Sequence, residues 1–280
     1  MKRPPAAILT AHEMDRERRD LYVEGTTDQA FLEWLVDSRI SPRARVVPVD
    51  YVDIPEPDDG GGNRGRLLNF LTMVASEEAD IRGLVDADFD RLFGVAGDAP
   101  PNAWLTDHRD LESYVLAVEN FDAAIRGGCG LVGPSAADMF ASMADAALFL
   151  ASVRVVSLRQ SLKLPISKGT WIRHVKCADG KVVEVKRQPL ATGLLQAAGH
   201  SLKVREKFLT DVERTAEELA AHAPRDVLHG KDCMLILTKQ LSSTTVEVDD
   251  AGRLVRGTFQ RNRLHEFATL AAVVEYLAGA

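Results

Sequence analysis

The amino-acid sequence predicts an α/β fold, with a mostly parallel sheet flanked by helices, an inserted β-hairpin and a helical C-terminal part. Three observations support this prediction. Short apolar runs alternate with helical patterns over the first ninety residues, as in parallel sheets with helical crossovers. One of these runs, IRGLV, leads directly into the acidic stretch DADFD. Later, two alternating segments flank Asp179 and Gly180, and Asp-Gly is a strong signal for a hairpin turn.

The first ninety residues are expected to run strand, helix, strand, helix, strand. The expected strands are residues 20–24, 44–49 and 81–85. A helix should begin near Thr27, a suitable N-cap, and its stripe of Phe31, Trp34 and Leu35 should belong to the core. Pro48 favours an edge position for the second strand, because proline cannot donate a hydrogen bond to a sheet. The intervening segments are expected to be a polar helix outside the core at 6–18, a flexible loop at 55–65 and a helix at 67–74.

The rest of the chain is expected to be largely helical. A brief fourth strand is predicted at 103–106, and helices at 110–118, 134–151, 201–222, 231–241 and 259–278. Residues 153–187 are expected to be antiparallel strands, VRVV at 153–156 included. The chain would then divide into an α/β core, residues 1–125, and a helical region, residues 126–280. A basic hairpin insertion at about 151–188 would pack with that region on the core.

Composition indicates an ordinary globular protein of 280 residues, 46% hydrophobic and 27% charged. No apolar run approaches the ~20 residues of a membrane span, and the N-terminus does not resemble a secretory signal. The cysteines Cys129, Cys177 and Cys233 are far apart and lack metal-type spacing. We therefore expect a cytoplasmic, reduced protein without structural zinc.

The charge is unevenly distributed along the chain. Residues 1–150 carry 14 Lys and Arg against 27 Asp and Glu, whereas residues 151–188 carry 9 against 2. An acidic half followed by a compact basic segment is typical of a metal site coupled to a polyanion-binding surface. A basic hairpin that only solvates one face would give the same pattern. The basic residues that would contact nucleic acid are Lys168, Arg173, Lys176, Lys186 and Arg187.

Carboxylates gather where two of the expected strands end. Asp86, Asp88 and Asp90 follow the third strand, and Glu24 follows the first. First and third strands of a parallel sheet are commonly neighbours, and ligands bind at the carboxyl ends of such strands. Like charges this close repel one another, and a divalent cation would hold them together. We do not expect the strand to continue to Asp90, so Asp90 should support the site without binding the ion.

Further acidic residues follow the first and fourth strands. Gly25 lets the chain turn beside Glu24, and Asp28 lies in the first turn of the next helix. Asp110 and Glu112 could reach the same crevice from the stretch TDHRDLE, although helix capping by Asp107 explains part of that cluster equally well. His108 and Arg109 in this stretch could contact phosphate or could form a solvated loop.

In this order the motifs resemble a known family. VEGTTD, followed about sixty residues later by LVDADFD, is similar to the Glu-Gly and Asp-x-Asp signature of the TOPRIM fold. TDHRDLESYV and HGKD, at His229 to Asp232, resemble motifs of one bacterial branch. That branch contains the TOPRIM effector nucleases encoded beside ABC-type ATPases in phage-defence loci such as PARIS, which are related to the TOPRIM part of OLD-family nucleases. The four motifs span residues 22 to 232.

The resemblance implies a nuclease that uses Mg²⁺ or Mn²⁺, and the hard carboxylate oxygens suit such ions better than zinc. Glu24 would act as general base or bridging ligand, with Asp86 and Asp88 as further ligands. Asp28 and Glu112 would complete the metal set, and Asp110 would support it. Two metals, if bound, would lie ~3.5–4 Å apart. Lys231 would stabilise transition-state charge, although it could equally be a solvent-exposed helix residue.

The resemblance also implies biological partners. The protein would cleave DNA or RNA, tRNA among the candidates, as the toxic effector of an anti-phage system controlled by an ABC-type ATPase. It could act as a homodimer through the apolar stripes of residues 259–278. His229 is expected to cap a helix or pack in the core, and Trp171 to pack rather than stack on a nucleobase.

Other classes of protein share some of these features. Topoisomerases carry the module but need a further domain with a nucleophilic tyrosine, and bacterial primases need a zinc ribbon that this sequence lacks. A haloacid-dehalogenase-type phosphatase would also use Asp-x-Asp at a strand end, but it would leave Glu24 and Gly25 unexplained. A non-catalytic TOPRIM module that binds a partner or nucleic acid is the alternative outside enzymes.

Overall fold

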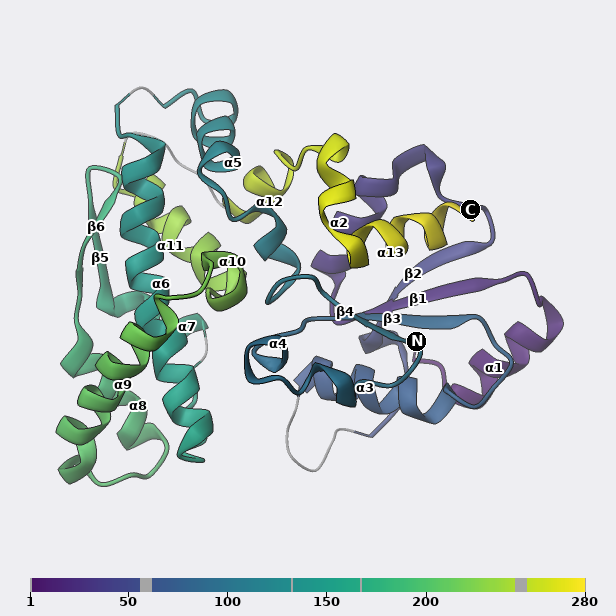
Figure 1. Ribbon diagram of the computed structural model, residues 1–280, viewed down its shortest axis with the longest axis horizontal. Helices are drawn as coiled ribbons and strands as arrows, with labels where there is room; N and C mark the ends of the chain where they lie inside the picture. The colour runs from purple at the N-terminus through teal and green to yellow at the C-terminus, as the bar shows by residue number, and fades with distance from the viewer. Residues whose placement is uncertain (1, 56–61, 132, 167, 245–250, 280) are drawn as a thin grey trace. The chain divides into compact units, whose positions relative to one another are not determined.

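A computed structural model describes residues 2–55, 62–131, 133–166, 168–244 and 251–279 of the chain. It confirms the predicted fold class, a parallel sheet flanked by helices, a separate hairpin and a helical C-terminal part (Figure 1). The residues fall into two compact units. The first comprises Met1–Leu111 and Gln260–Ala280, and the second comprises Glu112–Phe259. The predicted division into residues 1–125 and 126–280 stays a prediction.

The first unit contains a four-stranded, fully parallel sheet. Its strands are β1 (Arg19–Val23), β2 (Ala44–Pro48), β3 (Ile81–Val85) and β4 (Ala103–Leu105). Their order is β2-β1-β3-β4, so β1 and β3 are neighbours in the middle. All four strands were predicted within one or two residues. Pro48 ends the edge strand β2, where the missing N–H leaves no gap in the sheet.

Helices cover both faces of this sheet (Figure 1). On one face lie α2 (Thr26–Val36) and α13 (Ala268–Ala278), and on the other α1 (Pro5–Met14) and α3 (Gly62–Val74). A short helix, α4 (Asp90–Phe93), follows β3. The α1 and α3 side encloses an apolar cluster that includes Ile8, Tyr22 and Phe70. Burial on both faces explains why the strands are continuous apolar runs rather than alternating ones.

Three expectations for the first unit need correction. Helix α1 does reach the core, because Ile8 and His12 are both buried. In the α2 stripe, Phe31 and Leu35 are core residues, but Trp34 is 38% exposed and has the Arg261 guanidinium 5.0 Å from its ring centre. The expected loop at 55–65 is helical from Gly62 onward, and residues 56–61 lie outside the described residues.

The apolar side of α13 is used inside the first unit. Leu270, Val273, Val274 and Leu277 are buried, and the helix packs on α2, β1 and β2. These side chains therefore stabilise the sheet rather than offering a free surface for a second copy. A homodimer stays a prediction, without this stripe to support it.

The second unit is mostly helical and contains the hairpin. Its elements are α5 (Val118–Asp122), α6 (Ala136–Arg159), α7 (Lys168–Trp171), β5 (Val175–Ala178), β6 (Lys181–Val185), α8 (Arg187–Ala197), α9 (Arg205–Leu219), α10 (Pro224–Val227), α11 (Gly230–Ser242) and α12 (Ala251–Arg256). The predicted turn is confirmed, since Asp179 and Gly180 both have positive φ, 49° and 75°, as a type I′ turn requires. The predicted helix at 110–118 is instead a 3₁₀ helix, Leu111–Val115, followed by α5.

The prediction of strands from residue 153 was wrong for VRVV, which belongs to the long helix α6. Val153, Val155 and Val156 are all buried there, so tertiary packing overrides the modest preference of valine for strands. By length and composition α6 could cross a membrane, although no single apolar run of that length is evident in the sequence. Core helices of soluble proteins pass the same test, and 61% of the apolar window of α6 is buried.

Asp107 joins two distant parts of the first unit, and its removal should measurably weaken that unit. Its carboxylate accepts hydrogen bonds from the Thr269 and Leu270 amides, at 2.9 and 3.1 Å, in the first turn of α13. Asp107→Ala should therefore lower the free energy of unfolding by about 1–2 kcal/mol. Urea denaturation followed by tryptophan fluorescence measures the change. Asp98→Ala, at an exposed position, is the matched control, and equal losses in both variants would contradict the capping role.

Candidate metal and phosphate site

The middle of the sheet provides the position for a ligand site. From β1 the chain passes to β2 on one side, and then returns to β3 and β4 on the other. The carboxyl ends of β1 and β3 therefore flank the point where the strand order reverses. Open α/β sheets bind their ligands at such a point. Glu24 follows β1 and Asp86 follows β3, so both lie at this edge.

The structure brings Glu24 and Asp86 together, as predicted. The backbone amide of Asp86 donates a hydrogen bond to Oε1 of Glu24 at 3.0 Å. Oδ1 of Asp86 in turn accepts a hydrogen bond from the Leu111 amide at 3.2 Å. Both carboxylates are half-buried, so they are held by backbone donors and still open to solvent. Hydrogen bonds of this kind fix the orientation of a carboxylate.

Asp28 is also near this edge, but its carboxylate serves its own helix. Helix α2 begins one residue earlier than predicted, at Thr26, and Gly25 rather than Thr27 is its N-cap. Oδ2 of the buried Asp28 accepts a hydrogen bond from the Gly25 amide at 2.8 Å. This bond locks the turn beside Glu24 and uses the positive end of the helix. A metal-ligand role for Asp28 stays a prediction.

Arg64 is a residue of this edge that the sequence analysis missed. It lies in the first turn of α3, and its Nε donates to the Asp86 carbonyl oxygen at 3.0 Å. The same Nε is 3.6 Å from Oδ2 of Asp88, and Nη2 bonds to the Asp90 carboxylate. A cation is unfavourable at a helix N-terminus unless acids compensate it, and here they do. Its glycine-rich surroundings, GGGNRG, favoured an irregular loop and so concealed a charged helix start.

The two later aspartates occupy different positions. The strand ends at Val85 as expected, and Asp90 begins α4. Asp88 has a φ of 47°, a conformation that aspartate tolerates better than most residues, and its amide donates to the Arg109 carbonyl oxygen at 2.7 Å. Its side chain is 42% exposed. Asp88 is therefore held by its backbone, with a carboxylate that reaches solvent.

The segment after β4 braces the segment after β3. Oγ1 of Thr106 accepts a hydrogen bond from the Ala87 amide at 2.9 Å and donates to the His108 carbonyl oxygen at 2.7 Å. Arg109 is only 2% exposed, with its guanidinium 3.9 Å from the Phe89 ring centre and Nε 4.0 Å from Oδ1 of Asp88. The alternative prediction that Arg109 belongs to a solvated loop is therefore wrong. Asp110 is buried beside it in the sequence.

Several predicted site residues belong to the second unit. Glu112 is buried, and its Oε1 is 3.5 Å from Nη1 of Arg256. His229 is the N-cap of α11, because its Nδ1 accepts from the Asp232 amide at 3.3 Å, and its capping role is confirmed. Lys231 is the second residue of α11 and is half-buried. The metal role of Glu112 and the catalytic role of Lys231 stay predictions.

The basic segment of the second unit is partly neutralised. Arg173, Lys176, Lys186 and Arg187 are exposed, and the side chain of Lys168 lies outside the described residues. Four cations between 151 and 188 pair with acids elsewhere in the unit: Arg154 with Asp232, Arg159 with Glu218, Lys181 with Asp138, and Arg187 with Glu213. Trp171 is fully buried, which confirms its packing role. Arg173, Lys176 and Lys186 are the candidate contacts for nucleic acid, and Arg187 stays one although its Nη1 is 4.0 Å from Oε1 of Glu213.

The chemistry of the edge suits magnesium, although the side chains do not form a closed cluster. Throughout the described part of the chain, no group of three or more His, Cys, Asp or Glu side chains is placed to hold a metal ion. Magnesium commonly binds through one or two carboxylates and keeps several waters or substrate phosphates. Glu24 and Asp86 meet that smaller requirement with oxygen ligands alone. A magnesium site held by Glu24 and Asp86 stays a prediction.

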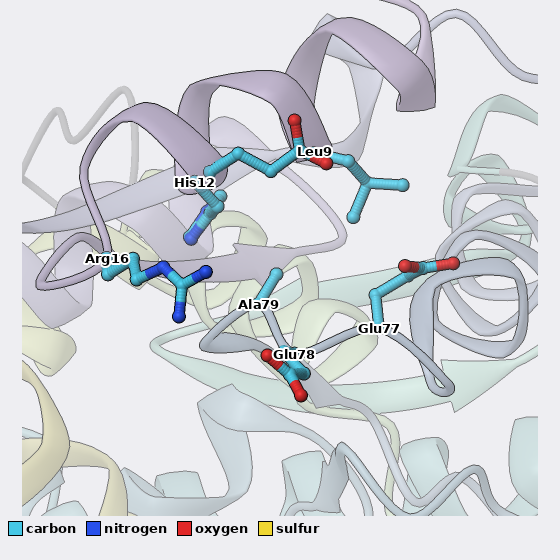
Figure 2. A pocket seen from close by; sticks show the side chains of 7 residues that line it. Leu9, His12, Arg16, Glu77, Glu78 and Ala79 are labelled. Carbon is cyan, nitrogen blue, oxygen red and sulfur yellow. The ribbon is translucent and has the colours of Figure 1, made fainter.

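A cavity of about 260 Å³ lies away from this site, on the first unit (Figure 2). Leu9, His12 and Arg16 of the α1 region line it together with Glu77, Glu78 and Ala79 (Figure 2). His12 bonds to Asp20 at the start of β1, and Ala79 precedes β3. The cavity is therefore at the amino ends of the central strands, opposite the edge that carries Glu24 and Asp86.

Comparison with known proteins leaves the chain unassigned, since neither a family model nor a curated protein matches it.

Arg64 neutralises the carboxylates of Asp88 and Asp90, so its removal should leave two uncompensated acids that a cation can stabilise. In Arg64→Met, Asp88 and Asp90 lose this counter-charge, and stability should fall by about 1 kcal/mol in EDTA. Mn²⁺ should recover that loss by ligand linkage. Thermal unfolding with EDTA and with Mn²⁺ measures both effects. Arg82→Met, on β3 beside Trp104, is the control. An equal response to Mn²⁺ in both variants would contradict the role of Arg64 as the counter-charge of Asp88 and Asp90.

Proposed function

We propose that the protein is a Mg²⁺-dependent nuclease of the TOPRIM type that cleaves phosphodiester bonds of nucleic acid. The observation that carries this proposal is the hydrogen bond from the Asp86 amide to the Glu24 carboxylate, at the strand-order reversal of a parallel sheet. It supports the proposal because it joins a residue of the Glu-Gly motif to a residue of the Asp-x-Asp motif. Their order in the chain and their elements agree with the family that the sequence resembles.

Each residue has a distinct role in the proposed reaction. Glu24 and Asp86 would hold the metal ion, which supplies Lewis acidity and lowers the pKa of a bound water. The Glu24 carboxylate is placed to accept a proton from the attacking water. Arg64 supplies a guanidinium group beside the acids, and such groups bind phosphate bidentately. The buried Arg109 would add positive charge near Asp88 without contacting the phosphate. Asp88, whose carboxylate is exposed, would be a further ligand if it released Arg64.

The biological setting of the proposal comes from the same resemblance. The enzyme would act as the toxic effector of a phage-defence system, restrained by an ABC-type ATPase and released on infection. Its substrate would be DNA or RNA. The exposed cations of the second unit, Arg173, Lys176, Lys186 and Arg187, would hold the substrate backbone.

A non-catalytic binding module is the second candidate, and one observation favours it. Arg64 already engages the Asp86 carbonyl group and the carboxylates of Asp88 and Asp90. A protein whose acids are neutralised from within can bind a partner or a nucleic acid without any metal ion. The two candidates differ in whether Glu24 and Asp86 are needed for cleavage.

Removal of the two central acids tests the nuclease proposal. Glu24→Ala and Asp86→Ala should each reduce cleavage by at least ~100-fold, because each removes a metal ligand and Glu24 also removes the base. Purified protein with Mg²⁺, Mn²⁺ or EDTA is incubated with duplex DNA, single strands and total cellular RNA, and products are resolved on gels.

The control for this test is Glu33→Ala, an exposed acid on α2 whose carboxylate bonds only with Gln29 among the described residues. It should leave cleavage unchanged. Unaltered cleavage in Glu24→Ala and Asp86→Ala would exclude the metal-dependent nuclease. Tight nucleic-acid binding by the wild type, with no cleavage of any substrate, would favour the binding module.

The role of the basic segment is tested by the dependence of binding on salt. Lys176→Glu with Lys186→Glu should weaken nucleic-acid binding and reduce the slope of log K against log salt by about 2, since two phosphate contacts are lost. Fluorescence anisotropy over a range of KCl concentrations measures the slope. Lys181→Glu is the control, because Lys181 already pairs with Asp138 at 2.7 Å. A slope unchanged in the double variant would remove this segment from the interface.

A further inference from the structure

The first unit has a second cavity, and its lining differs from that of the cavity beside Glu77 and Glu78. It measures about 450 Å³ and lies beside the edge strand β2, on the side of the sheet that α1 covers. Its polar lining consists of three arginines and two tyrosines: Arg3, Arg18, Arg45, Tyr22 and Tyr51. Three aliphatic side chains complete the lining. Pockets of this size accommodate small organic ligands.

The charge of this lining is unusual for its surroundings. The first 150 residues carry nearly twice as many acids as bases, 27 against 14, yet no carboxylate is among the described residues that line this cavity. Arg18 is paired with Asp20. Arg3 and Arg45 form no ion pair or side-chain hydrogen bond with any residue that the structure describes. Converging guanidinium groups repel one another unless an anion lies between them.

The fold fixes the backbones of Arg3 and Arg45 and the side chain of Arg18. The Arg3 amide donates to the Tyr51 carbonyl oxygen, and the Asp53 amide donates to the Arg3 carbonyl oxygen, both at 2.8 Å. Nε and Nη2 of Arg18 donate to Oδ2 of the fully buried Asp20, at 2.9 and 2.6 Å. Arg45 lies on β2 directly opposite Asp20 of β1. The guanidinium group of Arg18 is therefore preorganised, and only the backbones of Arg3 and Arg45 are fixed beside it.

Two tyrosines complete the recognition surface. Burial and the Asp20 carboxylate raise the pKa of the Tyr22 phenol, while Arg18 and Arg3 act in the opposite direction, so both guanidinium groups are close to it. Tyr22 therefore remains a neutral hydrogen-bonding group at the base of the cavity. Tyr51 is 50% exposed and can present its ring to a ligand. An exposed ring beside arginines is suited to stack on a nucleobase.

We propose that this cavity binds a nucleoside phosphate, with Arg3, Arg18 and Arg45 around the phosphate and Tyr51 against the base. Guanidinium groups match phosphate oxygens bidentately and remain charged at any physiological pH. The site is distinct from the Glu24 and Asp86 edge, and its occupancy requires neither acid nor a metal ion. It therefore goes beyond the proposed nuclease activity and gives the protein a separate nucleotide-binding function.

Calorimetric titration of the full chain tests the proposal with three probes, AMP, inorganic phosphate and adenosine, in low salt and EDTA. AMP should bind, phosphate should bind more weakly, and adenosine should give no heat. Arg3→Ala combined with Arg45→Ala should weaken AMP binding by at least ~10-fold, because bonds from charged donors are lost. Tyr51→Ala should weaken AMP binding and leave phosphate binding unchanged.

Arg43→Ala is the matched control, since this nearby arginine pairs with Asp15 and Glu17 outside the cavity. It should change AMP affinity by less than ~2-fold, as expected of an exposed ion pair. Arg18 is left intact because its loss would leave the buried Asp20 carboxylate without its arginine partner. Circular dichroism verifies that each variant is folded. Failure of the wild type to bind either AMP or phosphate at millimolar concentration, or an equal loss in Arg43→Ala, would overturn the proposal.

Discussion

Carboxylates that converge on one edge of a sheet must each be neutralised or hydrogen-bonded, and this constraint shapes the first unit. Because β1 and β3 are neighbours, Glu24 and Asp86 meet where those strands end. Backbone amides provide much of the compensation: Asp86 donates to Glu24, Gly25 to Asp28, and Leu111 to Asp86. Each donor belongs to a segment that immediately follows a strand or precedes a helix. The fold thus supplies positive dipoles at the place where its sequence concentrates negative charge.

Local pattern and strand adjacency were enough to predict much of this arrangement. Buried strands are short apolar runs followed by polar turns, so β1 to β4 could be read directly from the sequence. The helical state of VRVV could not be read in this way. A β-branched run inside a long helix has the same composition as a strand, and only packing decides between the two. The meeting of Glu24 with Asp86 followed from topology, because a parallel sheet aligns the ends of neighbouring strands.

The contacts that were missed join residues far apart in the sequence through side-chain geometry. Asp107 was considered as a local cap, but it caps α13, 162 residues away. Arg109 could have lain in a solvated loop, and only the position of Phe89 shows that it is buried in a stack. The arginine-lined cavity unites the N-terminal segment with β1 and β2, three elements with no shared motif. The spacing of residues along the chain does not reveal which distant side chains meet in the fold.

Arg64 connects the two candidate functions through one electrostatic argument. A metal ion among Asp86, Asp88 and Asp90 would repel the guanidinium that now lies beside them. A nuclease therefore requires Arg64 to leave these acids as the ion arrives, and an incoming phosphate offers it a bidentate partner of the correct charge. A binding module requires Arg64 to stay. A substrate phosphate would offer Arg64 a new partner and so free the carboxylates of Asp88 and Asp90. Their pairing with Arg64 in the free protein is therefore compatible with both candidate functions.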